Sequence, residues 1–231
     1  MLNNNEAFFG AMLHHMSMLN HQSMMVAMNE LSNHDHSRFL TRTNRMIGRI
    51  TTLGSAAAGA GINKGVFREA VTIQMSWPGA PTVYYADEAG QIGWTDPDNR
   101  RTYPWGHEDQ SLINLHKDLI RLRRELPVLR DGSLKPLLAE YGRIAYARFN
   151  DDLRCIIAVN NTGGWTDFRL FARDAGSHEG EAFFRRIQTT QEDHTTESEQ
   201  RAVVSEGFLS FELPPFSSVI LCNRENNQAD A

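Results

Sequence analysis

The stretch NELSNHDHSRF, residues 29–39, places Asp35 between two histidines at the end of an apolar run. The run MMVAMNEL, residues 24–31, has the length of a buried strand, so Asp35 is expected at the carboxyl end of that strand. From the residues alone, Asp35 is a catalytic carboxylate, a metal ligand together with His34 and His36, or a turn residue.

Around this stretch the pattern alternates between helix and strand. Apolar residues at helical spacing predict helices at residues 6–19, 66–77 and 110–124, and the runs at 24–31 and 83–85 predict strands. Pro78 and Gly79 end the second helix. Strands that alternate with helices indicate βαβ units and a parallel sheet.

The pattern changes near Pro127. Short alternating runs separated by Asn-Asp, Asn-Thr-Gly-Gly and Pro-Pro breaks predict an antiparallel β-sandwich over residues 131–224, with a frayed tail at 225–231. Residues 187–201, IQTTQEDHTTESEQR, are predicted to be a polar loop. We therefore expect an α/β part over residues 1–130, followed by an all-β domain.

Composition excludes several classes of protein. The net charge of −5 and the absence of a basic patch with interleaved aromatics argue against a nucleic-acid partner. No apolar run approaches the roughly 18 residues of a membrane span, and the N-terminus lacks the basic region of a signal peptide. Cys155 and Cys222 sit in apolar runs and are interpreted as buried thiols, which favours a reducing cytoplasm.

Two motifs in order carry a resemblance to a known family. NELSNHDHSRF is followed about 45 residues later by GAPTVYYADEAGQIGWTDPDNRRTYPW, and a β domain comes behind both. This arrangement resembles the α-amylase family of glycoside hydrolases, in particular the members that cut cyclodextrins, pullulan and short maltodextrins. The resemblance covers about residues 5–222. It implies the last two β/α units of a (β/α)₈ barrel, about strands seven and eight, plus a C-terminal β-sandwich.

The resemblance also implies roles for individual residues. Asp35 would be the carboxylate that stabilises the transition state, and His34 would hydrogen-bond the same sugar ring. Asp96 and Arg100 would belong to the rim of the sugar site, and Arg38 would brace a carboxylate or contact the substrate. These roles are chemically sound, because a fixed carboxylate stabilises a cation-like glycosyl transition state and accepts hydrogen bonds from vicinal hydroxyls.

Two further carboxylates of the family are not found in the sequence. Retaining glycosidases need a nucleophile and a general acid roughly 5 Å apart. The family's Arg-x-Asp strand and its acid Glu would precede Asn33, and neither pattern occurs there. We therefore expect a fragment that is inactive alone, that needs the missing N-terminal barrel portion in cis or in trans, or that forms an oligomer through its open barrel segment. No cofactor is expected.

Several aromatic and acidic residues remain ambiguous from sequence. Trp94, Tyr103 and Trp105 suit sugar stacking or loop packing. Asp87 and Glu88 are adjacent at the end of the second predicted strand, where neighbouring side chains would point to opposite faces, which favours structural or rim roles over a catalytic pair. The family more often has Gly where this chain has Ala86, a residue that disfavours positive φ. Asp96 is alternatively a turn residue before Pro97.

The leading hypothesis is thus part of a retaining α-glucan hydrolase. A second hypothesis is a non-catalytic protein or subunit that binds α-glucan oligosaccharides through the β domain and the aromatic loop. A third is a metal-binding module built on the Met- and His-rich start, MLHHMSMLNHQSMM.

Overall fold

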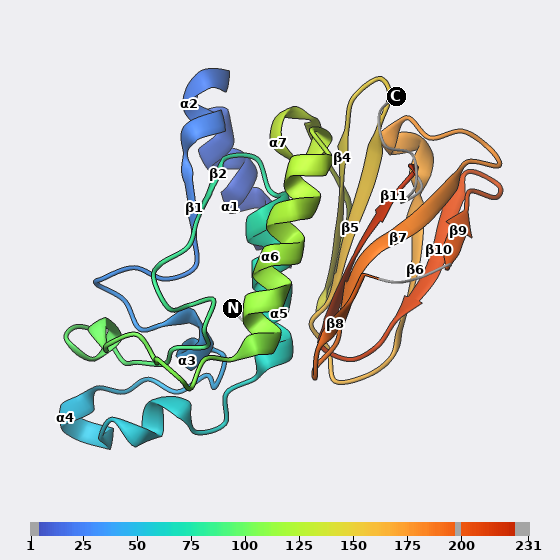
Figure 1. Cartoon of the computed structure of the whole chain (residues 1–231). Helices are drawn as coiled ribbons and strands as arrows, with labels where there is room; N and C mark the ends of the chain where they lie inside the picture. Colours follow the sequence, from blue (N-terminus) through green and yellow to red (C-terminus); the bar gives the residue numbers. More distant parts are fainter. Residues whose placement is uncertain (1–4, 197–199, 225–231) are drawn as a thin grey trace.

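The structure is a computed structural model that describes residues 5–196 and 200–224. Its chain divides into a first part of helices with two short strands and a second part made of β-strands (Figure 1). Helices α5 (Lys64–Ser76) and α6 (Gln110–Glu125) lie between these two parts. The predicted tail at 225–231 lies outside the described residues.

The first part confirms the predicted parallel pairing. Strand β1 (Met28–Glu30) pairs in parallel with β2 (Ala80–Thr82), with Asn29 opposite Pro81. The remaining elements are α1 (Asn5–Ser17), α2 (His21–Val26), α3 (Phe39–Arg42), α4 (Ile50–Leu53), α7 (Val128–Asp131) and two 3₁₀ helices at Ala56–Gly59 and Asp98–Arg100.

Strand β1 is shorter than the predicted run 24–31, and β2 lies earlier in the chain than the predicted run 83–85. Met24 and Met25 belong to α2, because the Asn20 side chain accepts a hydrogen bond from the Ser23 amide and starts a helix there. The predicted strand at 83–85 is wrong, since β2 ends at Thr82. The chain then turns through Ala86, whose φ is +67°.

Helices α5 and α6 lie close to the predicted ranges 66–77 and 110–124. The side chain of Asn63 caps α5 by accepting from the Val66 amide, and that of Asp109 caps α6 by accepting from the Leu112 amide. Helix α5 ends before Pro78 and Gly79. The buried face of α6 contains Leu112, Leu115, His116, Leu119 and Leu122.

The second part is antiparallel throughout, as predicted. One sheet has the order β3 (Ser133–Glu140), β4 (Arg143–Phe149), β5 (Arg154–Asn160), β11 (Ser217–Cys222), β7 (Ala182–Thr189), β8 (His194–Thr195), with β9 (Arg201–Val203) also paired to β7. A smaller sheet pairs β6 (Thr166–Phe171) with β10 (Phe208–Leu213). Strand β8 lies within the segment predicted to be a polar loop.

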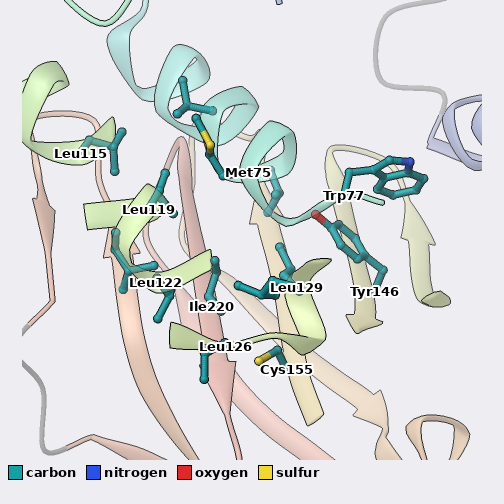
Figure 2. Close-up of a cluster of buried hydrophobic side chains, with 14 of the residues drawn as sticks. Met75, Trp77, Leu115, Leu119, Leu122, Leu126, Leu129, Tyr146, Cys155 and Ile220 are labelled. Atoms are coloured by element: carbon teal, nitrogen blue, oxygen red, sulfur yellow. The ribbon is translucent and has the colours of Figure 1, made fainter. Parts of the chain in front are cut away.

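Each face of the larger sheet has its own hydrophobic core. Figure 2 shows the first core, in which Leu119, Leu122 and Met75 from the helices face Ile220 and Tyr146 from the sheet. The second core lies between the two sheets. The predicted boundary near residue 130 therefore separates two parts of the sequence whose side chains share the first core.

The two cysteines lie opposite each other in that first core. Cys155 on β5 pairs in register with Cys222 on β11, and both are buried free thiols, which confirms their interpretation as small apolar residues. In the described ranges, no helix combines the length and apolar character needed to cross a bilayer.

Candidate functional site

Asp35 lies in a short turn that follows β1 at its carboxyl end. The Asn33 side-chain oxygen accepts hydrogen bonds from the backbone amides of Asp35 and His36, at 3.0 and 3.1 Å. This arrangement is an Asx turn, which fixes the backbone that carries Asp35. The Asp35 side chain is 64% exposed, and its carboxylate is 3.4 Å from His34 Nε2. A fixed, open carboxylate beside an imidazole can accept hydrogen bonds from a polyhydroxy ligand.

Arg38 connects the Asp35 turn to the segment after β2. Its Nη1 donates to Asp87 Oδ1 at 2.9 Å and to the Tyr85 carbonyl at 2.5 Å. Its guanidinium carbon also lies 4.1 Å from the centre of the Tyr84 ring. Burial raises the pKa of Asp87, although hydrogen bonds from Ser32 and Arg38 oppose that shift.

A third segment, residues 96–100, closes the site from the other side. Asn99 Nδ2 donates to the carbonyls of Asn33 and His36, at 3.1 and 2.8 Å. Arg100 Nε donates to the His34 carbonyl at 3.2 Å and pairs with Asp96 Oδ1 at 2.7 Å. The structure thus brings His34, Asp35, Asp96 and Arg100 together, although 61 residues separate Asp35 from Asp96 in sequence (96 − 35).

Two of the predicted substrate-binding residues are placed differently. Arg38 has no exposed side-chain surface, so it is a brace for Asp87 and not a contact for a ligand. Trp94 is only 1% exposed, and its indole Nε1 donates to the Gly54 carbonyl at 3.0 Å. The prediction that Trp94 stacks on a sugar is therefore wrong, because the ring is used in packing the loop.

Trp105 is the aromatic residue of this loop that remains open. Its side chain is 79% exposed, and its ring centre lies 4.5 Å from that of Tyr103. The sequence left sugar stacking and loop packing open for both rings. The exposure of Trp105 leaves its face available for contact with a sugar ring.

The site is held together by residues whose roles were not predicted from the sequence. Asn99 hydrogen-bonds to Asn33, and the rings of Tyr84 and Tyr85 stack on Arg38, so these contacts join segments about 45–65 residues apart. In the sequence these residues are visible only as polar and aromatic positions within the second of the two quoted motifs. Asp87 is buried against Arg38, which confirms a structural role for it.

No three His, Cys, Asp or Glu side chains gather in metal-binding geometry within residues 5–196 and 200–224. His34, Asp35 and His36 are adjacent in sequence but do not form such a group. The described structure thus gives no support to the metal-ligand interpretation of Asp35.

Known proteins resemble this chain over much of its length. The chain is 32% identical over 199 residues to neopullulanase 2 of Thermoactinomyces vulgaris, which covers 84% of this chain and 29% of the relative. It is 40% identical over 121 residues to the amylopullulanase of Thermoanaerobacter thermohydrosulfuricus, covering 52% of this chain and 8% of the relative. This chain belongs to the α-amylase family.

The structural neighbours of this α-amylase-family chain have the same fold. A cyclomaltodextrin glucanotransferase with a three-domain ABC distribution aligns with a TM-score of 0.71 and 20% identity, over 96% of this chain and 41% of its own. A cyclomaltodextrinase aligns with a TM-score of 0.68 and 22% identity, over 90% and 31%. No family model matches the chain. The chain spans well under half the length of these relatives.

Proposed function

We propose that these residues are the C-terminal part of a retaining α-glucan hydrolase that acts on maltodextrin-, cyclodextrin- or pullulan-type bonds. The observation that carries this proposal is the placement of Asp35, His34, Asp96 and Arg100 in one open cluster at the carboxyl ends of two parallel strands. Active sites of (β/α)₈ barrels lie at that end of the strands. The names of the relatives, neopullulanase and cyclomaltodextrinase among them, support the substrate class.

In this proposal Asp35 binds sugar hydroxyls and stabilises the positive charge that develops on the ring. His34 donates a hydrogen bond to the same ring, and the Asp96–Arg100 pair grips its outer side. Arg38 and Asn99 hold the Asp35 turn in place through the buried hydrogen bonds described above. The nucleophile and the general acid would come from a polypeptide segment outside these 231 residues, so we expect no hydrolysis by this chain alone.

The surface beside β1 supports packing of further β/α units. Among the described strands, β1 pairs only with β2, which leaves its other edge open. A cavity of about 360 Å³ also lies beside β1, lined largely by apolar side chains that include Phe8, Met12, Phe39 and Trp77. Barrel strands close a sheet by pairing along both edges. We propose that the missing barrel portion, in cis or in trans, covers this surface.

The test begins with the coding sequence upstream of Met1. A polypeptide extended by those codons, or complemented by the N-terminal barrel portion of neopullulanase 2, should hydrolyse maltodextrin or pullulan. Asp35→Asn should then lower kcat/KM by about 10²–10³-fold, because it removes a charge that stabilises the transition state. Asp151→Asn, at an exposed turn of the β domain, is the matched control and should leave kcat/KM unchanged.

Two outcomes would contradict the proposal. One is Asp35-dependent turnover by the 231-residue chain without any added segment. The other is an extended or complemented enzyme whose activity is unaffected by Asp35→Asn.

The second candidate function is a non-catalytic glucan-binding protein or subunit. The exposure of Trp105 beside Tyr103 favours it, since an open aromatic face can bind a sugar without any catalytic carboxylate. Glucan affinity without hydrolysis under all the conditions above, lost on Trp105→Ala, would support this alternative.

A further inference from the structure

The β domain has a second groove, formed by elements other than those that carry the Asp35 cluster. A cavity of about 500 Å³ opens between β7, β10 and β11. Its apolar lining includes Leu213, Val219 and Leu221, and its polar lining includes Arg185 and Gln188. A mixed lining of this kind is typical of ligand sites, which combine apolar surface with a few polar groups.

The groove exists because the two sheets differ in width. The sheet of β6 and β10 has two strands, whereas the sheet it packs on contains seven. Phe183, near the start of β7, is fully buried in the core between the sheets. Further along β7, Arg185 pairs with Leu221 and Gln188 pairs with Val219, so both face the same side as that core. The inner face of β7 therefore changes from apolar to polar where the groove opens.

Two polar atoms in this groove lack hydrogen-bond partners among the described residues. Gln188 is 9% exposed, and its side-chain oxygen accepts no hydrogen bond. Arg185 Nε is likewise buried and unpaired, and burial lowers the pKa of its guanidinium. Buried polar groups in proteins are nearly always satisfied, so such a pair points to a ligand that supplies the missing donor and acceptor.

Trp165 stands at the rim of the groove with an open ring. Its side chain is 70% exposed, although it belongs to the lining of the cavity. The turn before it is fixed by the buried Asn160, whose Nδ2 donates to the carbonyls of Gly164 and Pro214 at 2.8 and 2.7 Å. An aromatic ring held open by a rigid turn loses little freedom when a ligand stacks on it.

We propose that this groove is a second binding site for α-glucan, separate from the Asp35 cluster. Trp165 stacks on the apolar face of one glucose unit, the Gln188 oxygen accepts a hydrogen bond from a sugar hydroxyl, and Arg185 Nε donates to a hydroxyl oxygen. The choice of α-glucan as the ligand rests on the proposed function. The groove itself is built entirely by residues of this chain, so it should bind without any added barrel segment.

The experiment is a titration of the 231-residue chain with maltoheptaose, followed by calorimetry. Trp165→Ala should raise Kd by at least about tenfold, and Trp165→Phe should retain most of the affinity because it keeps a flat ring. Gln188→Leu should also weaken binding, since it removes the acceptor. Tyr141→Ala, at another exposed aromatic position of the β domain, is the matched control and should leave Kd unchanged. Circular dichroism checks that each variant is folded.

Trp105→Ala separates this site from the Asp35 cluster. Affinity that survives Trp105→Ala and is lost in Trp165→Ala supports the groove. Affinity that is lost only in Trp105→Ala, or the absence of saturable binding by the unsubstituted chain, overturns it. Neither result bears on Asp35-dependent hydrolysis by the extended enzyme, so a failure of the groove proposal can be distinguished from a failure of the proposed function.

Discussion

Arg38 and Asp87 form an ion pair at 2.9 Å between the turn after β1 and the turn after β2, with side chains 0% and 5% exposed. The pair joins the two segments that carry the candidate site. Arg38 also donates to the carbonyls of Tyr85 and Asn99. The position of Asp35 therefore depends on a contact that is buried away from the open cluster of Asp35, His34, Asp96 and Arg100.

Removing the charge of Arg38 should unfold this region. Arg38→Met leaves the Asp87 carboxylate buried without a partner, and breaking a buried pair in this way costs about 3–5 kcal/mol. The free energy of unfolding, measured by urea titration, should fall by that amount. Arg124→Met, at an exposed position of α6, should change it by less than about 0.5 kcal/mol. A small effect of Arg38→Met would show that the pair does not hold the site together.

Substitutions on the buried face of α6 should lower the free energy of unfolding more than substitutions on its exposed face. Leu119 is buried in the core shared with the sheet, whereas the adjacent Ile120 is 36% exposed. Leu119→Ala should lower the free energy of unfolding by about 2–5 kcal/mol, and Ile120→Ala by much less. Because helix and sheet share this core, fluorescence and far-UV circular dichroism should report one coincident transition. Two separated transitions would instead indicate that the β domain is stable by itself.

Glu69 should make stability dependent on pH. The carboxyl lies on α5 against the sheet, accepts a hydrogen bond from Asn161 at 2.5 Å, and has its pKa raised well above 4.5 by burial. An acid whose pKa rises on folding costs stability once it ionises. Stability should therefore be highest below pH 4.5, as far as Glu69 is concerned, and should fall as the pH rises through the folded-state pKa.

Glu69→Gln tests this contribution directly. The amide keeps the shape of the neutral acid and cannot ionise, so the decline above pH 4.5 should be smaller than in the unsubstituted chain. Glu212→Gln, on an exposed position of β10, should leave the decline unchanged. Stability curves are measured by urea unfolding at a series of pH values. Superimposable curves for Glu69→Gln and the unsubstituted chain would contradict the prediction.

The two thiols should be unreactive in the folded chain. Cys155 and Cys222 are both buried, and burial raises the pKa of Cys155, which disfavours the reactive thiolate. Ellman's reagent at neutral pH should react with them only as fast as the chain unfolds, and at once in denaturant. Rapid reaction of the native chain would mean that the sheet between β5 and β11 opens readily.

Much of the secondary structure could be predicted from local pattern. Each signal lies within a single element. These signals are the apolar spacing of α6, the Pro-Gly pair that ends α5 and the short alternating runs of the β domain. The strands of the first part were predicted less well. Met24 and Met25 belong to an apolar run with the length of a buried strand, but the cap at Asn20 makes them helical. Tyr84 and Tyr85 are strand formers, but their rings pack around Arg38.

The pattern of apolar and polar residues was enough to predict that Asp35 follows a strand and that a second motif lies at the end of the next one. It also determined that an antiparallel β domain comes behind them. Which aromatic and charged residues are exposed could be learned only from the folded chain. Trp94 is buried against Gly54 and Trp105 is exposed, although both belong to one polar loop. The burial of such residues depends on contacts with segments tens of residues away. The spacing of apolar residues within one segment does not predict those contacts.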